Sequence, residues 1–249
     1  MELGHILSPG RPAHLRSLSQ VSTLPSSPAP SWPTEPSAAW LRARLATPDP
    51  DDAAVASPQA SADAWTPPWQ DDRDPGECEK LTPAAVLVPI ILGSAPGILL
   101  TKRSEKLRNH SGQISFPGGR IDPTDPSPEH AALREAQEEV GLDPASVEVI
   151  GRLRDYVTGT GYRVTPVLAL LTPGYTTKLA PAEVSEIFEL PWATLLDPAA
   201  PERRSAEYRG RLRHYWVWPH PKHHIWGATA AILVHLAHRL RGKEESASF

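Results

Sequence analysis

The pattern of hydrophobic and polar positions predicts strands and helices that follow one another from residue 81 onward. An almost continuous apolar run over residues 84–92 is typical of a buried strand, and residues 97–103 form a second strand after a turn. Later ranges predict strands at 147–157, 162–171 and 186–190, a helical turn at 192–196, paired strand segments at 207–218 and a helix at 225–240. Strands mixed with two substantial helices indicate an α+β or α/β fold.

The clearest helical pattern begins at Pro128. Ser127 can cap its N-terminus, Pro128 suits the first helical position, and Gly141 provides a C-terminal stop. Its apolar stripe consists of Ala132, Leu133, Ala136 and Val140. The pattern therefore predicts a helix that packs one side against the sheet.

Three carboxylates lie on one face of this predicted helix. Glu135, Glu138 and Glu139 are separated by three and four residues, which places them together on an α-helix. Because like charges this close repel one another, a cation is expected in front of them, and carboxylate oxygens suit Mg²⁺ or Mn²⁺. The alternative is a solvated face on which Arg134 pairs with Glu138.

The segment upstream, residues 116–119, reads Phe-Pro-Gly-Gly and predicts a turn. In such a turn the backbone can come close to a ligand. Gly118 and Gly119 are therefore candidates for substrate contacts, and the carbonyl of either residue is a candidate for a further metal ligand.

These features together resemble the Nudix box, whose usual form is G, five residues, E, seven residues, then R-E-U-x-E-E-x-G-U, with U apolar. Residues 134–142 fill the last nine places. The first half departs from the pattern, because Gly119 lies one residue too far upstream and Pro126 occupies the place of the early glutamate. Asp122 and Asp125 lie in the intervening loop instead.

Residues 99–119, LLTKRSEKLRNHSGQISFPGG, are similar to the signature of the coenzyme A pyrophosphatase branch of the Nudix hydrolase family. The longer loop before the helix, and the segment IWGATA at residues 225–230, also resemble that branch. The matching signature positions are Leu99, Leu100, Thr101, Arg103, Arg108, Gly112 and the segment Phe116 to Gly119.

The resemblance implies a Nudix fold over residues 81–240, with a mixed β-sheet sandwiched between α-helices. It also implies metal-dependent hydrolysis of coenzyme A or an acyl-CoA, giving 3′,5′-ADP and (acyl-)4′-phosphopantetheine, with Mg²⁺ or Mn²⁺ as the cofactor. A Nudix enzyme for another substrate, such as ADP-ribose, NADH or a dinucleotide, is one alternative. A non-catalytic nucleotide-binding module is another, although the intact sequence REAQEE favours an enzyme.

The resemblance also implies roles for the glutamates and arginines of the two motifs. The three helical glutamates would hold the metal, with Arg134 as a positioning residue that pairs with a carboxylate. Arg103 and Arg108 would meet the phosphates of the substrate, including a 3′-phosphate, because a guanidinium matches phosphate oxygens in a fork. The alternative for either arginine is an ion pair with Glu105 or with an acid of the box.

A general base must reach the attacking water, and the sequence leaves its identity open. Glu183 is our first choice outside the helix, Glu186 is the second, and a helical glutamate is also compatible with the role. His110 is more typical of a hydrogen-bonding loop residue, and the histidines in residues 220–224 are more typical of a polar loop than of a zinc site.

Composition limits the remaining possibilities for this chain of 249 residues. A hydrophobic fraction of 40% supports a proper core, and a net charge of −4 argues against a protein that coats nucleic acid. Cys78 is the single cysteine, so an intrachain disulfide is excluded and a reducing, cytoplasmic location is expected. The apolar runs are too short for a membrane span. A small-molecule substrate is the expected partner, and a homodimer is one of the states open to the chain.

The chain outside the expected domain has a different composition. Residues 1–36 are rich in Pro, Ser and Ala and predict a disordered tail. Residues 37–80 predict a short helix at 37–45 followed by a linker, and residues 241–249 predict a short C-terminal tail.

Overall fold

The computed structural model describes residues 32–46, 81–107, 109–171, 173–208 and 210–242. All of these ranges belong to one compact unit, Ser31–Phe249. Most of the expected N-terminal tail, the expected linker with Cys78, the substrate candidate Arg108 and residues 243–249 lie outside the described residues.

The unit is built on an eight-stranded mixed sheet. Its main path runs through β3 (Ile114–Ser115), β2 (Gly97–Arg103), β1 (Thr82–Ile91), β7 (Tyr162–Leu171) and β5 (Val147–Arg152). Three further strands pair with this path: β4 (Gly118–Arg120) with β1, β6 (Tyr156–Val157) with β7, and β8 (Val184–Pro191) with β2. The β1 and β7 strands are parallel, and the other pairs in this sheet are antiparallel.

The apolar sequence of β1 follows from its position inside the sheet. Ala85 and Leu87 pack into the hydrophobic cluster on one face, whereas Val88 and Ile90 pack into the cluster on the other face. Because successive side chains of a strand point to opposite faces, a strand covered on both faces must be apolar along its length.

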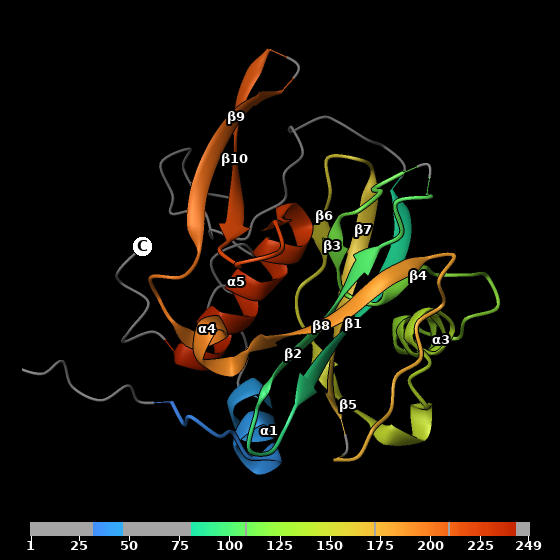
Figure 1. Ribbon diagram of the computed structural model, residues 1–249, viewed down its shortest axis with the longest axis vertical. Coiled ribbons are helices and arrows are strands. Elements are labelled where there is room, and N and C mark those ends of the chain that lie inside the picture. The colour runs from blue at the N-terminus through green and yellow to red at the C-terminus, as the bar shows by residue number, and fades with distance from the viewer. Residues whose placement is uncertain (1–31, 47–80, 108, 172, 209, 243–249) are drawn as a thin grey trace, which may run out of the picture. The chain divides into compact units, whose positions relative to one another are not determined.

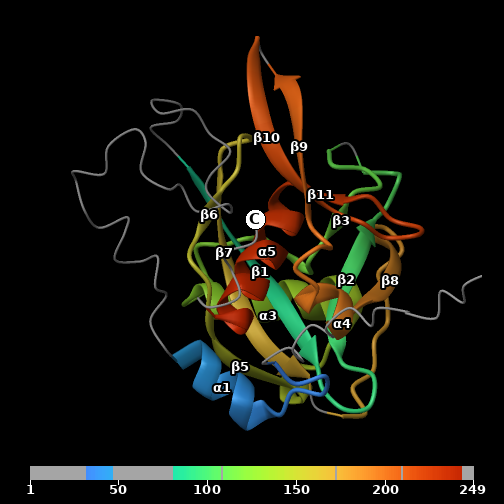
Figure 2. The same ribbon diagram turned by 90° about the vertical axis from the view of Figure 1, so that its left-hand side faces the viewer.

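Helices cover both faces of the sheet (Figures 1 and 2). One face packs against α3 (Pro128–Val140), which is followed by the 3₁₀ helix η1 (Pro144–Ser146). The other face packs against α5 (Gly227–Arg241), α4 (Trp192–Leu196) and α1 (Ala38–Ala46). This arrangement confirms the expected mixed sheet between helices. None of the helices in the described ranges is both long and apolar enough for a membrane span.

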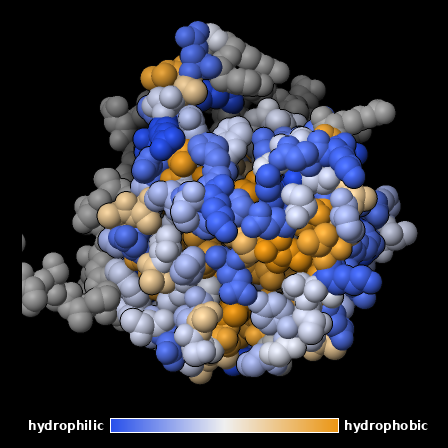
Figure 3. All heavy atoms as spheres, viewed as in Figure 1, coloured by the Kyte–Doolittle hydropathy of each residue, from blue (hydrophilic) through white to orange (hydrophobic). Residues whose placement is uncertain are grey.

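Not all apolar side chains of this unit are fully covered. Leu133, Ile187 and Phe188 are only partly buried where they pack against the two clusters. On the face viewed in Figure 3, hydrophobic residues in orange lie between hydrophilic residues in blue.

A second sheet of three strands joins the C-terminal part of the unit. It contains β9 (Glu202–Tyr208), β10 (Arg211–Trp218) and β11 (Ile225–Trp226) in the order β11-β10-β9. The β9–β10 hairpin therefore begins earlier than the strand segments that we predict at 207–218. The expected helix at 225–240 begins two residues late, because Ile225 and Trp226 pair with Trp218 and Val217.

One expectation for the strands after α3 needs correction. The single strand predicted over 147–157 is divided into β5 and β6, because the backbone leaves the ladder between Arg152 and Tyr156. A proline inside a strand, such as Pro166, indicates an edge or a bulge. Pro166 does not lie at an edge, since β7 lies between β1 and β5. It lies opposite this interruption, where its carbonyl accepts a hydrogen bond from the Leu153 N–H at 3.0 Å, so the sheet accommodates a residue that lacks an N–H.

The first residues that the structure describes pack against the folded unit, although the sequence predicts a disordered tail there. Trp32 packs against the core cluster, and the indole N–H of Trp192 donates to the carbonyl of Pro33 at 3.0 Å. The helix expected at 37–45 is confirmed as α1, with the Ser37 hydroxyl accepting from the Trp40 N–H at 3.1 Å. Residues 32–36 therefore differ from the tail that their composition predicts.

Candidate active site

The local sequence of α3 explains why the helix lies where it does. The Ser127 hydroxyl accepts from the His130 N–H, Pro128 occupies the first turn, and Gly141 ends the helix in the left-handed conformation, with a φ of 65°. The predicted caps are thus confirmed. The buried stripe is Ala131, Ala132, Ala136 and Val140, with Leu133 only partly buried.

The glycines before α3 form a strand instead of the predicted turn. Gly118 and Gly119 belong to β4 and lie opposite Val86 and Ala85 of β1. At Gly118 the φ is 153°, and a Cβ would lie 2.4 Å from the carbonyl oxygen of Ala85. At Gly119 a Cβ would lie 2.6 Å from the carboxylate of Glu135. Glycine at both positions therefore lets the strand approach the acidic face of α3.

Glu139 is the deepest carboxylate on that face, with only 3% of the residue exposed. Its Oε2 accepts a hydrogen bond from the Gly118 N–H at 3.0 Å, and its Oε1 lies 3.6 Å from Nη1 of Arg103. Burial raises the pKa of Glu139 to about 7, and the charges of Glu135 and Glu183 act in the same direction. The hydrogen bond from Gly118 and the charge of Arg103 oppose this rise.

The two other helical glutamates share one partner, Arg134. Its Nη1 donates to Oε1 of Glu135 at 2.9 Å and to Oε2 of Glu138 at 3.2 Å. Burial raises the pKa of Glu135 despite this contact, with the charges of Glu138 and Glu183 also raising it. The side chain of Glu138 is 59% exposed, so it is the most exposed of the three acids.

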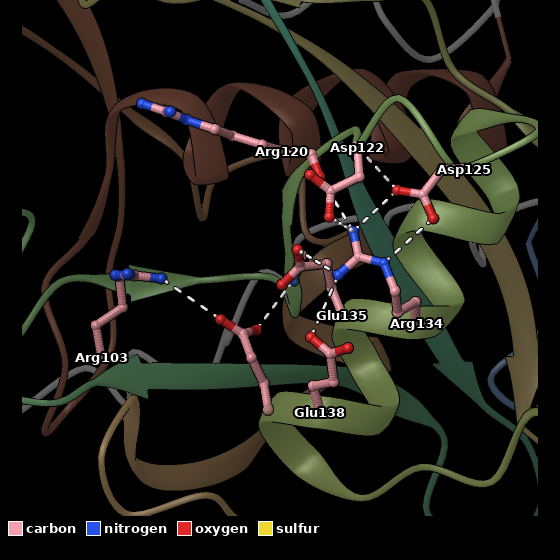
Figure 4. A network of polar contacts seen from close by, with 9 residues as sticks. Arg103, Arg120, Asp122, Asp125, Arg134, Glu135 and Glu138 are labelled. Carbon is pink, nitrogen blue, oxygen red and sulfur yellow. Dashed lines mark hydrogen bonds and ion pairs between the residues drawn. The ribbon is translucent and has the colours of Figure 1, made fainter.

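Arg134 is the centre of a polar network in which its guanidinium lies among carboxylates (Figure 4). Besides the two glutamates, it binds Asp125, with Nε to Oδ1 at 3.2 Å and Nη2 to Oδ2 at 2.9 Å. These hydrogen bonds raise the pKa of the guanidinium, with Asp125 as the largest cause. Sequence reasoning gave no role to Asp125, although its place in the lengthened loop was the available signal.

The basic residues of the upstream motif are only partly described. Arg103, which is labelled in Figure 4, lies at the end of β2. Its contact with Glu139 pairs it with an acid of the box, which was the alternative to a substrate contact. Lys102, its neighbour in β2, pairs with Glu105 at 3.0 Å. Arg108 lies outside the described residues, so its role stays a prediction.

The candidates for a general base lie in different surroundings. The Ser104 N–H donates to the Glu183 carbonyl at 2.7 Å, which places Glu183 beside Arg103 at the end of β2. The charge of Glu183 contributes to the raised pKa of both Glu135 and Glu139. Glu186 instead lies 3.4 Å from Nε2 of His223. His110 has a positive φ of 56°, and its Nδ1 lies 2.9 Å from the Gln113 side-chain oxygen, which fits a loop residue.

Two of the three histidines at 220–224 form a stack of rings with Phe188. His223 lies over Phe188 with a centroid distance of 4.1 Å, and His220 lies over His223 at 4.7 Å. Burial is the main cause that lowers the pKa of His220. The stacked arrangement fits the polar loop that the sequence predicts.

The chemistry of the acidic face fits a hard divalent cation. Its donors are carboxylate oxygens. Burial, with a smaller contribution from neighbouring carboxylates, raises the pKa values of Glu135 and Glu139, and a bound positive charge would offset both effects. As placed, no group of three or more His, Cys, Asp or Glu side chains in the described ranges could hold a metal. Arg134 and Arg103 contact the glutamates instead, so cation binding requires these carboxylates to turn from their guanidinium partners.

The chain belongs to the NUDIX domain family, which its residues 81–215 match. It is 44% identical over 154 residues to the "Uncharacterized Nudix hydrolase NudL" of Escherichia coli (strain K12), over 62% of this chain and 80% of that relative. It is therefore a Nudix hydrolase of nucleoside diphosphate derivatives, a pyrophosphohydrolase. Nudix hydrolases generally use divalent metal ions, typically Mg²⁺ or Mn²⁺.

Solved structures show a more distant likeness. A Caenorhabditis Ap4A hydrolase, solved as a "C. elegans Ap4A Hydrolase Binary Complex", is 22% identical, with a TM-score of 0.38, over 45% of this chain and 80% of that chain. The NUDIX domain of Shewanella oneidensis NrtR, complexed with ADP ribose, is 23% identical, also with a TM-score of 0.38, over 50% and 82% of the two chains. Likeness at this level carries no argument about the substrate.

Proposed function

We propose that the protein hydrolyses the diphosphate bond of coenzyme A or an acyl-CoA, with Mg²⁺ or Mn²⁺ as the cofactor. The products are 3′,5′-ADP and (acyl-)4′-phosphopantetheine. The observation that carries this proposal is the approach of Arg103 to Glu139, with Nη1 3.6 Å from Oε1. Arg103 belongs to the segment that resembles the coenzyme A branch, and Glu139 belongs to the Nudix box, so both motifs meet at one site.

The residues of α3 hold the cation in this proposal. Glu135, Glu138 and Glu139 supply the carboxylates, and the carbonyl of Gly118 or Gly119 is a further candidate ligand. When bound there, a cation would neutralise phosphate charge and lower the pKa of bound water. The N–H of Gly118 keeps one oxygen of Glu139 fixed, which leaves the other oxygen facing Arg103 and the substrate.

Arg103 supplies a second positive charge for the substrate. Its Nε is buried and has no hydrogen-bond partner among the described residues, and Nη1 is too far from Glu139 for a hydrogen bond. The guanidinium thus keeps N–H groups that can donate to a phosphate oxygen. Because Arg103 lies beside the acidic face, we assign it to the diphosphate and leave the 3′-phosphate to Arg108.

Glu183 is the proposed general base. It accepts a proton from the attacking water, whose oxygen forms a new bond to phosphorus while the bond from phosphorus to the bridging oxygen breaks. The second phosphate leaves with that oxygen. The Ser104 N–H donates to the Glu183 carbonyl at 2.7 Å, which ties this residue to the end of β2 next to Arg103.

A substrate panel tests the proposal. Coenzyme A, an acyl-CoA, ADP-ribose, NADH and diadenosine polyphosphates are incubated with the protein and Mg²⁺ or Mn²⁺, and the products are identified by mass spectrometry. We expect the highest kcat/KM with coenzyme A or the acyl-CoA, with 3′,5′-ADP as one product. A higher kcat/KM for one of the other nucleotides would assign the protein to a different Nudix substrate. Turnover of none of them would overturn the proposal and indicate another nucleoside diphosphate derivative as the substrate.

A further inference from the structure

Asp125 and Arg134 form a two-point ion pair beside the acidic face. The two side-chain oxygens of Asp125 accept from Nε and Nη2 of Arg134, at 3.2 Å and 2.9 Å. The Asp125 side chain is only 7% exposed, and its Oδ2 also accepts from the Asp122 N–H at 2.8 Å. Arg134 is the main cause of a lowered pKa of Asp125, so the acid is fully charged at neutral pH.

This ion pair leaves Arg134 with one guanidinium nitrogen for hydrogen bonds to the glutamates of α3. With Nε and Nη2 directed at Asp125, only Nη1 reaches Glu135 and Glu138. The same Nη2 also donates to the Arg120 carbonyl at 3.2 Å, which anchors the guanidinium to β4. If the charge of Asp125 were lost, these glutamates would be the remaining carboxylates in hydrogen-bond contact with the guanidinium, and they would hold it more tightly.

The position of Asp125 follows from the way in which the first half of this Nudix box differs from the usual pattern. Pro126 stands where an early glutamate is usual, and the loop from Gly119 to Arg134 is one residue longer. In this longer loop Asp125 is the neighbour of that proline, and its side chain reaches Arg134 from nine residues upstream. The neighbouring Asp122 is 3.8 Å from Nη2, and its side chain is 62% exposed.

We propose that Asp125 is a positioning residue, which holds Arg134 so that Glu135 and Glu138 can release it and bind the catalytic cation. This inference rests on the proposed function, because it assumes that these glutamates are metal ligands. Asp125 itself touches neither the cation nor the substrate. It acts through the guanidinium, which would otherwise compete with the cation for the same carboxylate oxygens.

The test is calorimetric titration of the full chain with Mn²⁺ in the absence of substrate. We expect Asp125→Asn to weaken Mn²⁺ binding by about tenfold, the lower end of the effect of removing partners that orient metal ligands. Asp125→Glu, which keeps the charge, should restore part of the affinity. Asp122→Asn is the matched control from the same loop, and it should bind Mn²⁺ as the wild type does.

A second comparison separates action through Arg134 from other roles. In a chain that already carries Arg134→Gln, Asp125→Asn should not weaken Mn²⁺ binding further. A tenfold loss in both backgrounds would make Asp125 a direct ligand and overturn the proposal. Thermal unfolding with EDTA checks the fold of each variant, and a loss of affinity that only accompanies unfolding would also overturn it.

The outcome also separates this inference from the proposed function. Unchanged Mn²⁺ affinity in Asp125→Asn, with the wild type binding Mn²⁺ and hydrolysing coenzyme A, would overturn the role of Asp125 alone. A wild type that binds no Mn²⁺ would overturn the metal site, and the role of Asp125 with it. Suppose that Mn²⁺ binds with the expected variant effects but coenzyme A is not hydrolysed. This result would support the positioning role of Asp125 and contradict the proposal that coenzyme A is the substrate.

Discussion

At the scale of single residues, Glu139 is a carboxylate whose burial holds its pKa close to neutral. Burial raises this pKa from its ordinary value of 4.5 to about 7, and the charges of Glu135 and Glu183 add to the effect. Near neutral pH the protonated and charged forms of Glu139 are therefore both populated in the metal-free protein. A cation that binds the charged form must compete with this proton.

We expect the metal-free protein to lose stability as the pH rises from 4.5 through 7. A glutamate whose pKa is raised by folding binds its proton more tightly in the folded state. Its contribution is therefore complete below pH 4.5 and is lost as the pH rises through about 7. The difference between the ordinary pKa of 4.5 and the raised pKa of about 7 limits this loss of stability to roughly 3 kcal/mol. Urea unfolding in EDTA across this pH range measures the free energy of unfolding.

The comparison of two variants isolates the contribution of Glu139. Glu139→Gln should flatten the fall in stability, because the amide does not titrate. Glu148→Gln is the control, since Glu148 lies in an exposed pair with Arg42 and its removal should leave the fall intact. The same fall in Glu139→Gln as in the wild type would assign it to other groups.

Arg103 gives a second prediction at this scale, because of its place beside Glu139. Arg103→Gln should raise KM by about tenfold or more, since a charge-assisted hydrogen bond contributes roughly 1.5–3 kcal/mol. The rise should be similar for coenzyme A and for 3′-dephospho-CoA, because we assign Arg103 to the diphosphate. Steady-state kinetics with both substrates measure it.

Lys102→Gln provides the control for Arg103, since Lys102 is its neighbour in β2 but pairs with Glu105. It should leave KM nearly unchanged. A rise in KM for coenzyme A alone after the change of Arg103 would move this arginine to the 3′-phosphate, against our assignment.

At the scale of elements, the close pairing of β4 with β1 is what brings the glycine pair to α3. Gly118→Ala should destabilise the fold more than Gly151→Ala does. Both glycines have nearly the same φ, 153° and 154°, but a Cβ at Gly118 would meet the Ala85 carbonyl at 2.4 Å, whereas Gly151 has open space. Backbone strain of about 1–3 kcal/mol is common to both, and overpacking adds about 1–3 kcal/mol at Gly118.

Chemical unfolding of the two variants measures this difference directly. Because the backbone strain is matched, the excess destabilisation of Gly118→Ala reports the close approach of β4 and β1. Equal destabilisation of the two variants would mean that the strands separate easily to admit a methyl group.

The sequence predicts some elements better than others for a physical reason. The helix α3 is marked by local signals, Ser127, Pro128 and Gly141, and each acts within one turn. The β4 strand has no local signal, because a Phe-Pro-Gly-Gly segment is typical of a turn and its strand pairing depends on distant β1. The contact of Asp125 with Arg134 depends on the path of the loop, which no periodicity encodes.

At the scale of the whole molecule, the N-terminal boundary of the folded part can be tested by truncation. A chain that begins at Ser31 should keep the stability of the full chain, because the composition of the preceding residues does not favour burial. A chain that begins at Ser37 loses Trp32 and the Pro33 carbonyl, which leaves the buried Trp192 N–H without this partner. We expect this chain to be about 1–3 kcal/mol less stable.

Thermal and urea unfolding of both shortened chains provide the measurement. The sequence alone places this boundary at residue 36, because the proline-rich composition continues to that point. Composition does not reveal that the Pro33 carbonyl in this segment accepts a hydrogen bond from the buried indole of Trp192. Equal stability of the two chains would support the boundary predicted from the sequence.

The most direct test of the account is the Mg²⁺-dependent release of 3′,5′-ADP from coenzyme A by the wild type, Glu138→Gln and Glu139→Gln. The wild type should release 3′,5′-ADP and 4′-phosphopantetheine in equal amounts. Glutamine keeps the size of the side chain but removes the charge that a hard cation needs, so each variant should lose at least about a hundredfold in kcat, or roughly 2.7 kcal/mol. Near-full Mg²⁺-dependent activity in both variants would contradict the account, because Glu138 and Glu139 would then not hold the catalytic cation.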